Sequence, residues 1–235
     1  MTNQTNGKTA LIVGASRGLG LALVREYLKR GWQVIATVRQ QAAPEALAAL
    51  RAQHPAALTI EHLEMNAPDE VAALRRRLEG RRLDLLFVNA GVANGPAETV
   101  RDTATEEFMR LMLTNALSPL RVMETLLDCV PPGGIVAVMS SGLGSVTNNV
   151  AGGWEVYRAS KAALNTLVRS FAVRHAGDSR TYLVIAPGWV RTDMGGPAAA
   201  LDVEESIPGV VNAIEQRSGT AGALYIDYQN QIVPW

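Results

Sequence analysis

Tyr157 and Lys161 are the two residues of this sequence whose types and spacing most clearly suit chemistry. A four-residue spacing places both side chains on one face of a helix, with the ammonium one turn from the phenol. A phenol with a pKa near 10 transfers protons poorly at neutral pH, and lowering that pKa to about 7 requires roughly 4 kcal/mol. A nearby cation in a partly dry site can supply this energy. The pair therefore predicts a tyrosine that acts as a general acid or base.

A glycine-rich turn, Gly14-Ala-Ser-Arg-Gly-Leu-Gly20, follows an apolar run and precedes a segment with helical spacing. Glycines allow the backbone to turn sharply and to approach a pyrophosphate, whose charge the helix N-terminus stabilises. An ordinary strand–helix turn is the alternative interpretation. The flanking strand and helix favour a dinucleotide site.

The end of the next predicted strand, Ala36-Thr-Val-Arg39, bears on which dinucleotide is bound. An acidic residue in this region would select NAD by accepting a hydrogen bond from the ribose 2′-hydroxyl, and the segment contains none. We expect Arg17 and Arg39 to bind a 2′-phosphate together, because arginine binds phosphate in a bidentate manner. Two solvated arginines are the alternative, and we predict NADP(H).

These residues need a scaffold that brings the ends of several strands to one place. We predict strands at residues 9–13, 34–38, 58–63, 83–88, 135–139, 182–186 and 224–226. Helices are expected at 19–30, 44–53, 69–80, 103–129, 155–175 and 203–216, with a capping box at Thr103 to Glu106 and a kink near Ser118 before Pro119. The alternation implies an α/β Rossmann fold, a doubly wound parallel sheet with helices on both faces. Residues 1–235 are expected to form one domain, since one core serves up to roughly 250 residues.

The composition excludes several classes of function. The 22 basic and 22 acidic residues cancel, so neither a nucleic acid nor an anionic membrane surface is an expected partner. The 48% of apolar residues and 19% of charged residues indicate extensive burial. A single cysteine, Cys129, and scattered histidines predict no metal site. A polar start and the lack of a long apolar run predict a cytoplasmic protein.

The motifs, taken in order, resemble the short-chain dehydrogenase/reductase family of the compact type. The matching residues are Gly14, Gly18 and Gly20, Asn89-Ala90-Gly91, Asn115, Ser140-Ser141, Tyr157 with Lys161, and Pro187-Gly188 with Thr192. The Ser140 to Ser145 stretch, the Gly188 to Gly196 stretch and the ending Pro234-Trp235 are similar to the C-factor/sniffer-type carbonyl reductases.

The resemblance implies a role for each site residue. Tyr157 would exchange a proton with the substrate oxygen, and Lys161 would lower the pKa of that tyrosine and bind the nicotinamide ribose. Ser141 would hydrogen-bond the substrate oxygen, and Asn115 would hold a water of a proton relay. The implied cofactor-binding residues are Gly14, Ser16, Arg17, Gly18, Leu19, Gly20, Arg39, Asn66, Asn89, Ala90, Gly91, Tyr157, Lys161, Pro187, Gly188, Val190 and Thr192. An apolar substrate pocket is expected to include Leu143, Trp154, Trp189 and Met194, although each of them also suits a core or an interface.

Two features depart from the family pattern. The spacing from Ser141 to Tyr157 is three residues longer than usual, so Ser140 and Ser145 stay open as alternatives for the acting serine. Asn66 stands where the family often has an aspartate beside the adenine, which keeps an acceptor and loses the charge.

We therefore predict an NADPH-dependent oxidoreductase that reduces a ketone or aldehyde to an alcohol, reversibly. The alternative is an NADP(H)-binding sensor or signalling protein of the same fold that does not turn substrate over. By family analogy, the protein is expected to form a homodimer or homotetramer.

Overall fold

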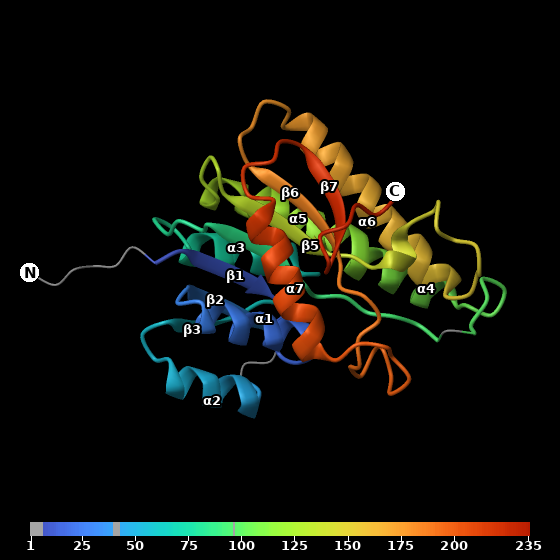
Figure 1. Ribbon diagram of the computed structural model, residues 1–235, viewed down its shortest axis with the longest axis horizontal. Coiled ribbons are helices and arrows are strands. Elements are labelled where there is room, and N and C mark those ends of the chain that lie inside the picture. The colour runs from blue at the N-terminus through green and yellow to red at the C-terminus, as the bar shows by residue number, and fades with distance from the viewer. Residues whose placement is uncertain (1–6, 40–42, 96) are drawn as a thin grey trace, which may run out of the picture.

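The computed structural model describes residues 7–39, 43–95 and 97–235. Its strands are parallel and form one sheet of order β3-β2-β1-β4-β5-β6-β7 (Figure 1). The strands are β1 (Thr9–Val13), β2 (Gln33–Val38), β3 (Leu58–His62), β4 (Leu85–Val88), β5 (Ile135–Met139), β6 (Thr181–Ala186) and β7 (Ala223–Asp227). The strand order reverses between β1 and β4, as in a Rossmann fold, which confirms the predicted fold class.

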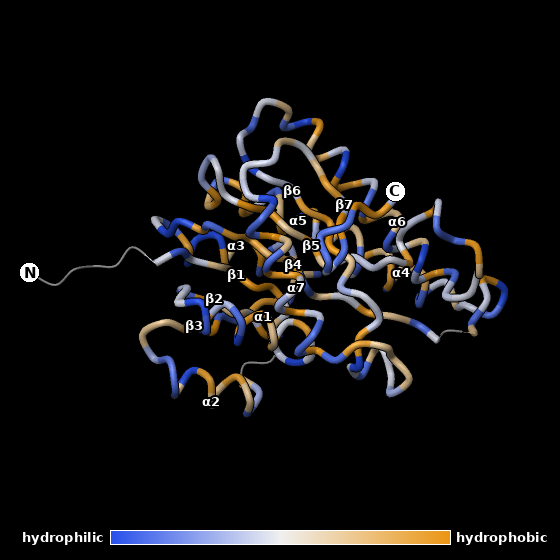
Figure 2. Tube along the Cα trace, in the orientation of Figure 1, coloured by the Kyte–Doolittle hydropathy of each residue, from blue (hydrophilic) through white to orange (hydrophobic). Residues whose placement is uncertain are grey.

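Helices cover both faces of this sheet. They are α1 (Gly18–Lys29), α2 (Glu45–Gln53), α3 (Pro68–Arg77), α4 (Thr105–Met112), α5 (Ser118–Leu126), α6 (Glu155–Arg174) and α7 (Val203–Gln216). Apolar side chains of α1, α2 and α7 pack on one face, and those of α3, α5 and α6 pack on the other. Figure 2 shows hydrophobic segments gathered on the central strands and hydrophilic ones toward the periphery. Every residue of β4 and β5 is buried, because each strand has helices above and below it.

The long helix predicted at 103–129 differs from expectation in two places. A π-helical turn, Leu113–Leu117, joins α4 to α5, so the irregularity lies before Ser118 and not at it. The predicted capping box is wrong, because Ala104 is the N-cap and the Thr103 hydroxyl donates to the Thr99 carbonyl instead. A capping box occurs at α7, where Asp202 and Glu205 bond each other's backbone N–H groups.

The chain folds back on itself after β7. Asn230 adopts a left-handed conformation with φ of 62°. Gln231 then accepts a hydrogen bond from the Asp227 N–H at 2.9 Å, and the Val233 N–H donates to the Tyr225 carbonyl at 2.8 Å. The last residues therefore pair with the outer edge of β7, and the Trp235 ring packs on Tyr225 with centroids 5.5 Å apart.

Within the described ranges, each helix is too short or too polar to span a lipid bilayer.

Candidate active site

Tyr157 and Lys161 lie in the first turns of α6, facing the carboxyl end of β5. Both are almost completely buried, with exposed fractions of 8% and 4%. The Lys161 ammonium donates to the Met139 carbonyl at 2.9 Å and lies 5.8 Å from the centre of the Tyr157 ring. The predicted helical pairing of phenol and ammonium is therefore present in the fold.

Burial decides the protonation of this pair. It raises the pKa of Tyr157 to about 12, although the Ser141 side chain acts in the lowering direction. It also lowers the pKa of Lys161 to about 8. The sequence predicts an ammonium that brings the pKa of the phenol down, whereas the structure has that pKa above its ordinary value. The physical reason is that dehydration of the phenolate outweighs the favourable contacts it receives.

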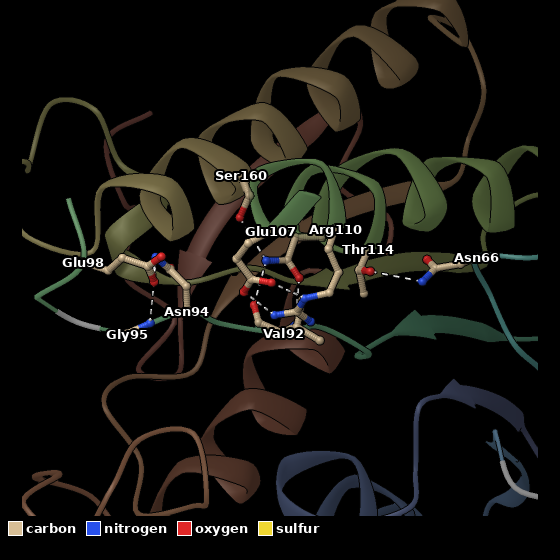
Figure 3. Close-up of polar contacts among 10 residues, drawn as sticks. Asn66, Val92, Asn94, Gly95, Glu98, Glu107, Arg110, Thr114 and Ser160 are labelled. Atoms are coloured by element: carbon tan, nitrogen blue, oxygen red, sulfur yellow. Dashed lines mark hydrogen bonds and ion pairs between the residues drawn. The ribbon is translucent and has the colours of Figure 1, made fainter. Parts of the chain in front are cut away.

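Asn115 lies in the π-helical turn and is completely buried. Its Oδ1 accepts from the Val92 N–H at 2.8 Å, and its Nδ2 donates to the Val92 carbonyl at 2.8 Å and to the Ser160 hydroxyl at 2.9 Å. The bonds that this amide makes to Val92 and Ser160 can be followed in Figure 3. Ser160 in turn donates to the Tyr157 carbonyl at 2.7 Å. The amide of Asn115 thus connects the segment after β4 to the helix that carries Tyr157.

A position close to Gly91 is where these groups converge. A Cβ atom built on Gly91 would lie 3.3 Å from both the Asn115 Oδ1 and the Lys161 Nζ. A side chain at this position would press on both polar groups, and glycine avoids this contact. π-Helical turns are frequent at functional sites, and this one brings the Asn115 amide to the ammonium.

The three candidate serines have different surroundings. The Ser140 hydroxyl is buried and donates to Asn165 Oδ1 at 2.6 Å. The Ser145 hydroxyl accepts from the Asn148 N–H at 3.1 Å within its own loop. Ser141 accepts from the Leu143 N–H at 3.1 Å, and its side chain contacts that of Tyr157. Of the three, Ser141 has the geometry suited to a substrate oxygen held beside Tyr157.

The glycine turn is packed tightly against the end of β4. Gly14 has φ of 86°, and a Cβ there would lie 2.6 Å from that of Ala90. A Cβ on Gly20 would lie 2.0 Å from the Gly14 carbonyl oxygen, which accepts from Asn89 Nδ2 at 2.8 Å. Gly18 has φ of 54° and opens α1. Among the described residues no side-chain oxygen caps the N-terminus of α1, which suits a pyrophosphate.

Arg17 and Arg39 flank this turn at the surface. The Arg17 guanidinium forms an exposed ion pair with Asp193, a partner that sequence reasoning missed. Arg39 is exposed and follows β2 directly, and its carbonyl bonds the His62 ring. β2 reaches the turn because Gly14 N donates to the Thr37 hydroxyl at 3.0 Å.

Asn66 follows β3 on the same side of the sheet. Its Nδ2 donates to the Thr114 hydroxyl at 3.1 Å (Figure 3). Its Oδ1 is buried and has no hydrogen-bond partner among the described residues. A buried acceptor without a partner is costly, so it calls for a donor from a ligand, such as the amino group of an adenine. The turn, Asn66 and the buried ammonium thus fit a dinucleotide.

The segment after β6 completes the carboxyl edge. The Pro187 carbonyl accepts from the Ser206 hydroxyl at 2.6 Å, and Gly188 has φ of 85°. Thr192 accepts from the Gly195 N–H at 3.1 Å, and its methyl group would lie 3.8 Å from a Cβ on Gly18. Residues of this segment therefore lie opposite the glycine turn. The remaining predicted cofactor residues, Ser16, Leu19 and Val190, belong to these same two segments.

The predicted substrate residues fall into two groups. Leu143 and Trp154 pack against Tyr157 in a small apolar cluster, and the Trp154 ring is 5.8 Å from the Tyr157 ring. Trp189 and Met194 are 56% and 46% exposed, and the Trp189 indole donates to the Gly195 carbonyl at 2.8 Å. The first group borders the candidate reacting oxygen, and the second lies in the exposed segment after β6.

Sequence reasoning missed Ser160 and Asn165, which both lie on α6. Asn165 holds the Ser140 hydroxyl through Oδ1 and the Gly144 carbonyl through Nδ2, at 2.6 and 3.1 Å. It is four residues after Lys161, so the helical spacing that linked Tyr157 and Lys161 could have found it. Ser160 is three residues after Tyr157, so helical spacing could have found it too.

Comparison with known proteins identifies the family. A model of the short chain dehydrogenase family matches residues 8–201. C-signal from Myxococcus xanthus is 37% identical over 155 residues, covering 65% of this chain and 93% of that protein. A short-chain dehydrogenase/reductase from Burkholderia multivorans, solved with bound NADP, is 50% identical with a TM-score of 0.95, covering 97% of this chain and all of that one. The carbonyl reductase Sniffer of D. melanogaster is 28% identical with a TM-score of 0.88, covering 98% and 100%.

These similarities agree with the buried Tyr157–Lys161 pair, the glycine turn and the strand order. They also confirm the predicted resemblance to the C-factor/sniffer-type reductases. The chain belongs to the short-chain dehydrogenase family of oxidoreductases.

Proposed function

We propose that the protein is an NADPH-dependent carbonyl reductase that converts a ketone or aldehyde to an alcohol, reversibly. The observation that carries the proposal is the buried Tyr157 hydroxyl, flanked by Ser141 and by the Lys161 ammonium. A sensor needs no buried acid of this kind. When bound, NADPH supplies the hydride that the carbonyl carbon receives.

Tyr157 supplies the proton in the reduction. Because the pKa of Tyr157 is about 12, the phenol carries its proton throughout the neutral range. At pH 7 the phenolate lies about 7 kcal/mol above the phenol, so Tyr157 holds a proton that the substrate oxygen can receive during reduction.

Ser141 and Lys161 assist this transfer. The Ser141 O–H donates to the substrate oxygen and stabilises the charge that develops there. Lys161, with a pKa of about 8, is cationic at neutral pH and offsets the negative charge left on Tyr157. The apolar ring of Trp154 and the Leu143 side chain border the substrate and keep water out.

We propose NADP(H) as the cofactor. The glycine turn and Asn89 would hold the pyrophosphate side, Asn66 the adenine, and Thr192 the nicotinamide. Arg39, exposed after a strand end without a carboxylate, would bind the 2′-phosphate. Arg17 would bind the same 2′-phosphate once its ion pair with Asp193 is broken. The NADP in the Burkholderia multivorans relative supports this assignment.

The test follows NADPH absorbance against aryl ketones, diketones and quinones. Tyr157→Phe should keep NADPH binding and lose about 10²–10⁴-fold in turnover, because it lacks the acidic proton. Tyr27→Phe is the matched control, since the buried Tyr27 hydroxyl has no partner among the described residues and lies away from the site on α1. Wild-type turnover in Tyr157→Phe would contradict the mechanism. Tight NADPH binding without turnover of any substrate would favour the sensor.

The homodimer or homotetramer and the cytoplasmic location stay predictions. Large apolar side chains exposed on α4, the π-helical turn and α6 support self-association: Phe108, Met109, Leu117, Leu167 and Val173. A monomeric mass measured by light scattering would contradict the predicted self-association.

A further inference from the structure

The loop between Ser141 and Trp154 holds the candidate serine, yet most of it has little contact with the rest of the protein. Residues 146–153 are all exposed, and Val150 is 93% exposed. The loop is also three residues longer than the family spacing. A long exposed segment opens easily unless contacts elsewhere fix it. The position of Ser141 therefore depends on the groups that anchor this loop.

Tyr225 anchors the start of this loop from β7. Its hydroxyl donates to the Ser141 carbonyl, and its ring is 1% exposed. Burial raises the pKa of Tyr225 to about 12, so this group remains a donor at all pH values of interest. The bond fixes the backbone of the residue whose side chain contacts Tyr157.

Trp235 anchors the middle of the same loop. Its carbonyl oxygen accepts from the Thr147 N–H at 3.2 Å and from the Thr147 hydroxyl at 3.0 Å. Its ring lies between Tyr225, at 5.5 Å, and the Arg169 guanidinium on α6, at 5.2 Å. The pairing of residues 231–233 with β7 brings this ring to the loop. Tyr225 and Trp235 thus form one continuous contact from the Ser141 backbone to Thr147.

We propose that Tyr225 is a positioning residue for Ser141, and that Trp235 supports it by holding Tyr225 and Thr147. This inference rests on the proposed function, because it assigns a purpose to the position of Ser141. Tyr225 touches neither substrate nor cofactor and acts through the Ser141 backbone. Its hydroxyl keeps the serine O–H directed at the oxygen that Tyr157 protonates.

Tyr225→Phe is the direct test, because it removes one hydroxyl and keeps the buried ring. Reductive kcat should fall about 3–10-fold, the equivalent of one hydrogen bond, while the Kd for NADPH stays unchanged. Tyr182→Phe is the matched control. Tyr182 is equally buried on the adjacent strand β6, and its hydroxyl bonds Asp178 at 3.0 Å, at the start of the strand away from Ser141. The Tyr182→Phe variant should leave kcat unchanged.

A double variant separates positioning from a general loss of stability. In a Ser141→Ala background, Tyr225→Phe should cause no additional loss of kcat, because the group it positions is gone. Equal kcat in the Tyr225→Phe and Tyr182→Phe variants, or an undiminished loss in the Ser141→Ala background, would overturn the proposal.

Amide hydrogen exchange tests the anchoring without any catalysis. The Leu143 and Thr147 N–H groups should exchange faster in Tyr225→Phe than in Tyr182→Phe. If Tyr225→Phe fails to fold, Trp235→Ala is the second variant, because it changes a half-buried position, and it should speed exchange at Thr147. Unchanged exchange in these variants would refute the inference, whereas a wild type that consumes no NADPH would refute only the proposed function.

Discussion

Replacing Lys161 with methionine should make the protein more stable and less active. The Lys161 ammonium is buried, and burial lowers its pKa from 10.5 to about 8. A cation whose pKa is lower in the folded than in the unfolded state destabilises the fold at every pH below both values. This penalty fades as the pH rises from the folded value toward the unfolded one.

The difference in pKa sets the size of the effect. At pH 7 the buried charge costs the folded state about 3 kcal/mol. Methionine has a similar length and packs well in irregular apolar space, so the core should accept it. The variant loses the hydrogen bond to the Met139 carbonyl, worth about 1 kcal/mol. The net gain in unfolding free energy should be about 2 kcal/mol at pH 7. At about pH 9.5 the charge costs roughly 1 kcal/mol, so the two proteins should be nearly equal.

Urea unfolding of the protein without added nucleotide measures this difference at both pH values. Lys29→Met, at an exposed position in the last turn of α1, is the matched control and should change stability little at either pH. NADPH-dependent turnover of Lys161→Met should fall about 100-fold, since the charge on Tyr157 is no longer offset. A variant less stable than wild type at pH 7, or a stability difference that does not narrow at pH 9.5, would refute the reasoning.

Three other changes have defined outcomes. Arg39→Asp should shift the NADPH/NADH affinity ratio by about 10–100-fold toward NADH, because a carboxylate repels the 2′-phosphate. An unchanged ratio in fluorescence titrations would contradict the role of Arg39 in binding the 2′-phosphate. Gly20→Ala should abolish NADPH binding and lower the unfolding free energy in urea by a few kcal/mol, since its Cβ would lie 2.0 Å from the Gly14 oxygen. Gly7→Ala is the control and should bind NADPH normally, because its Cβ would lie an ordinary 3.5 Å from its nearest neighbour. Cys129 is buried and burial raises its pKa, so its thiol should react with a disulfide reagent much more slowly in buffer than in urea; equal rates would contradict its burial.

The positions of the strands were accessible from the sequence because apolar runs and glycines mark them locally. β1 and β5 begin and end at the predicted residues, since β5 is wholly buried between two helical layers and β1 is buried at all positions after Thr9. α7 also has its predicted bounds, although Pro208 lies inside it. Its Asp202–Glu205 capping box fixes the start, and this pattern was readable but overlooked.

The features that escaped prediction depend on contacts between distant segments. The π-helical turn at Asn115 is stabilised by bonds to Val92 and Ser160, which no local pattern reveals. The pKa of Tyr157 reflects how completely the fold dehydrates it, and a helical spacing cannot report that. The ion pair of Arg17 with Asp193 joins residues 176 positions apart.

The return of the chain along β7 has a consequence for how copies of the protein can associate. An outer strand with free N–H and C=O groups is a template for pairing with another sheet. Here residues 231–233 occupy those groups of β7, so the sheet cannot extend across two subunits through this edge without displacing them. Displacement would also withdraw Trp235 from Thr147. Assembly through the helical faces leaves the Ser141 loop in place, whereas edge-to-edge aggregation through β7 would release that loop and inactivate each copy that joins.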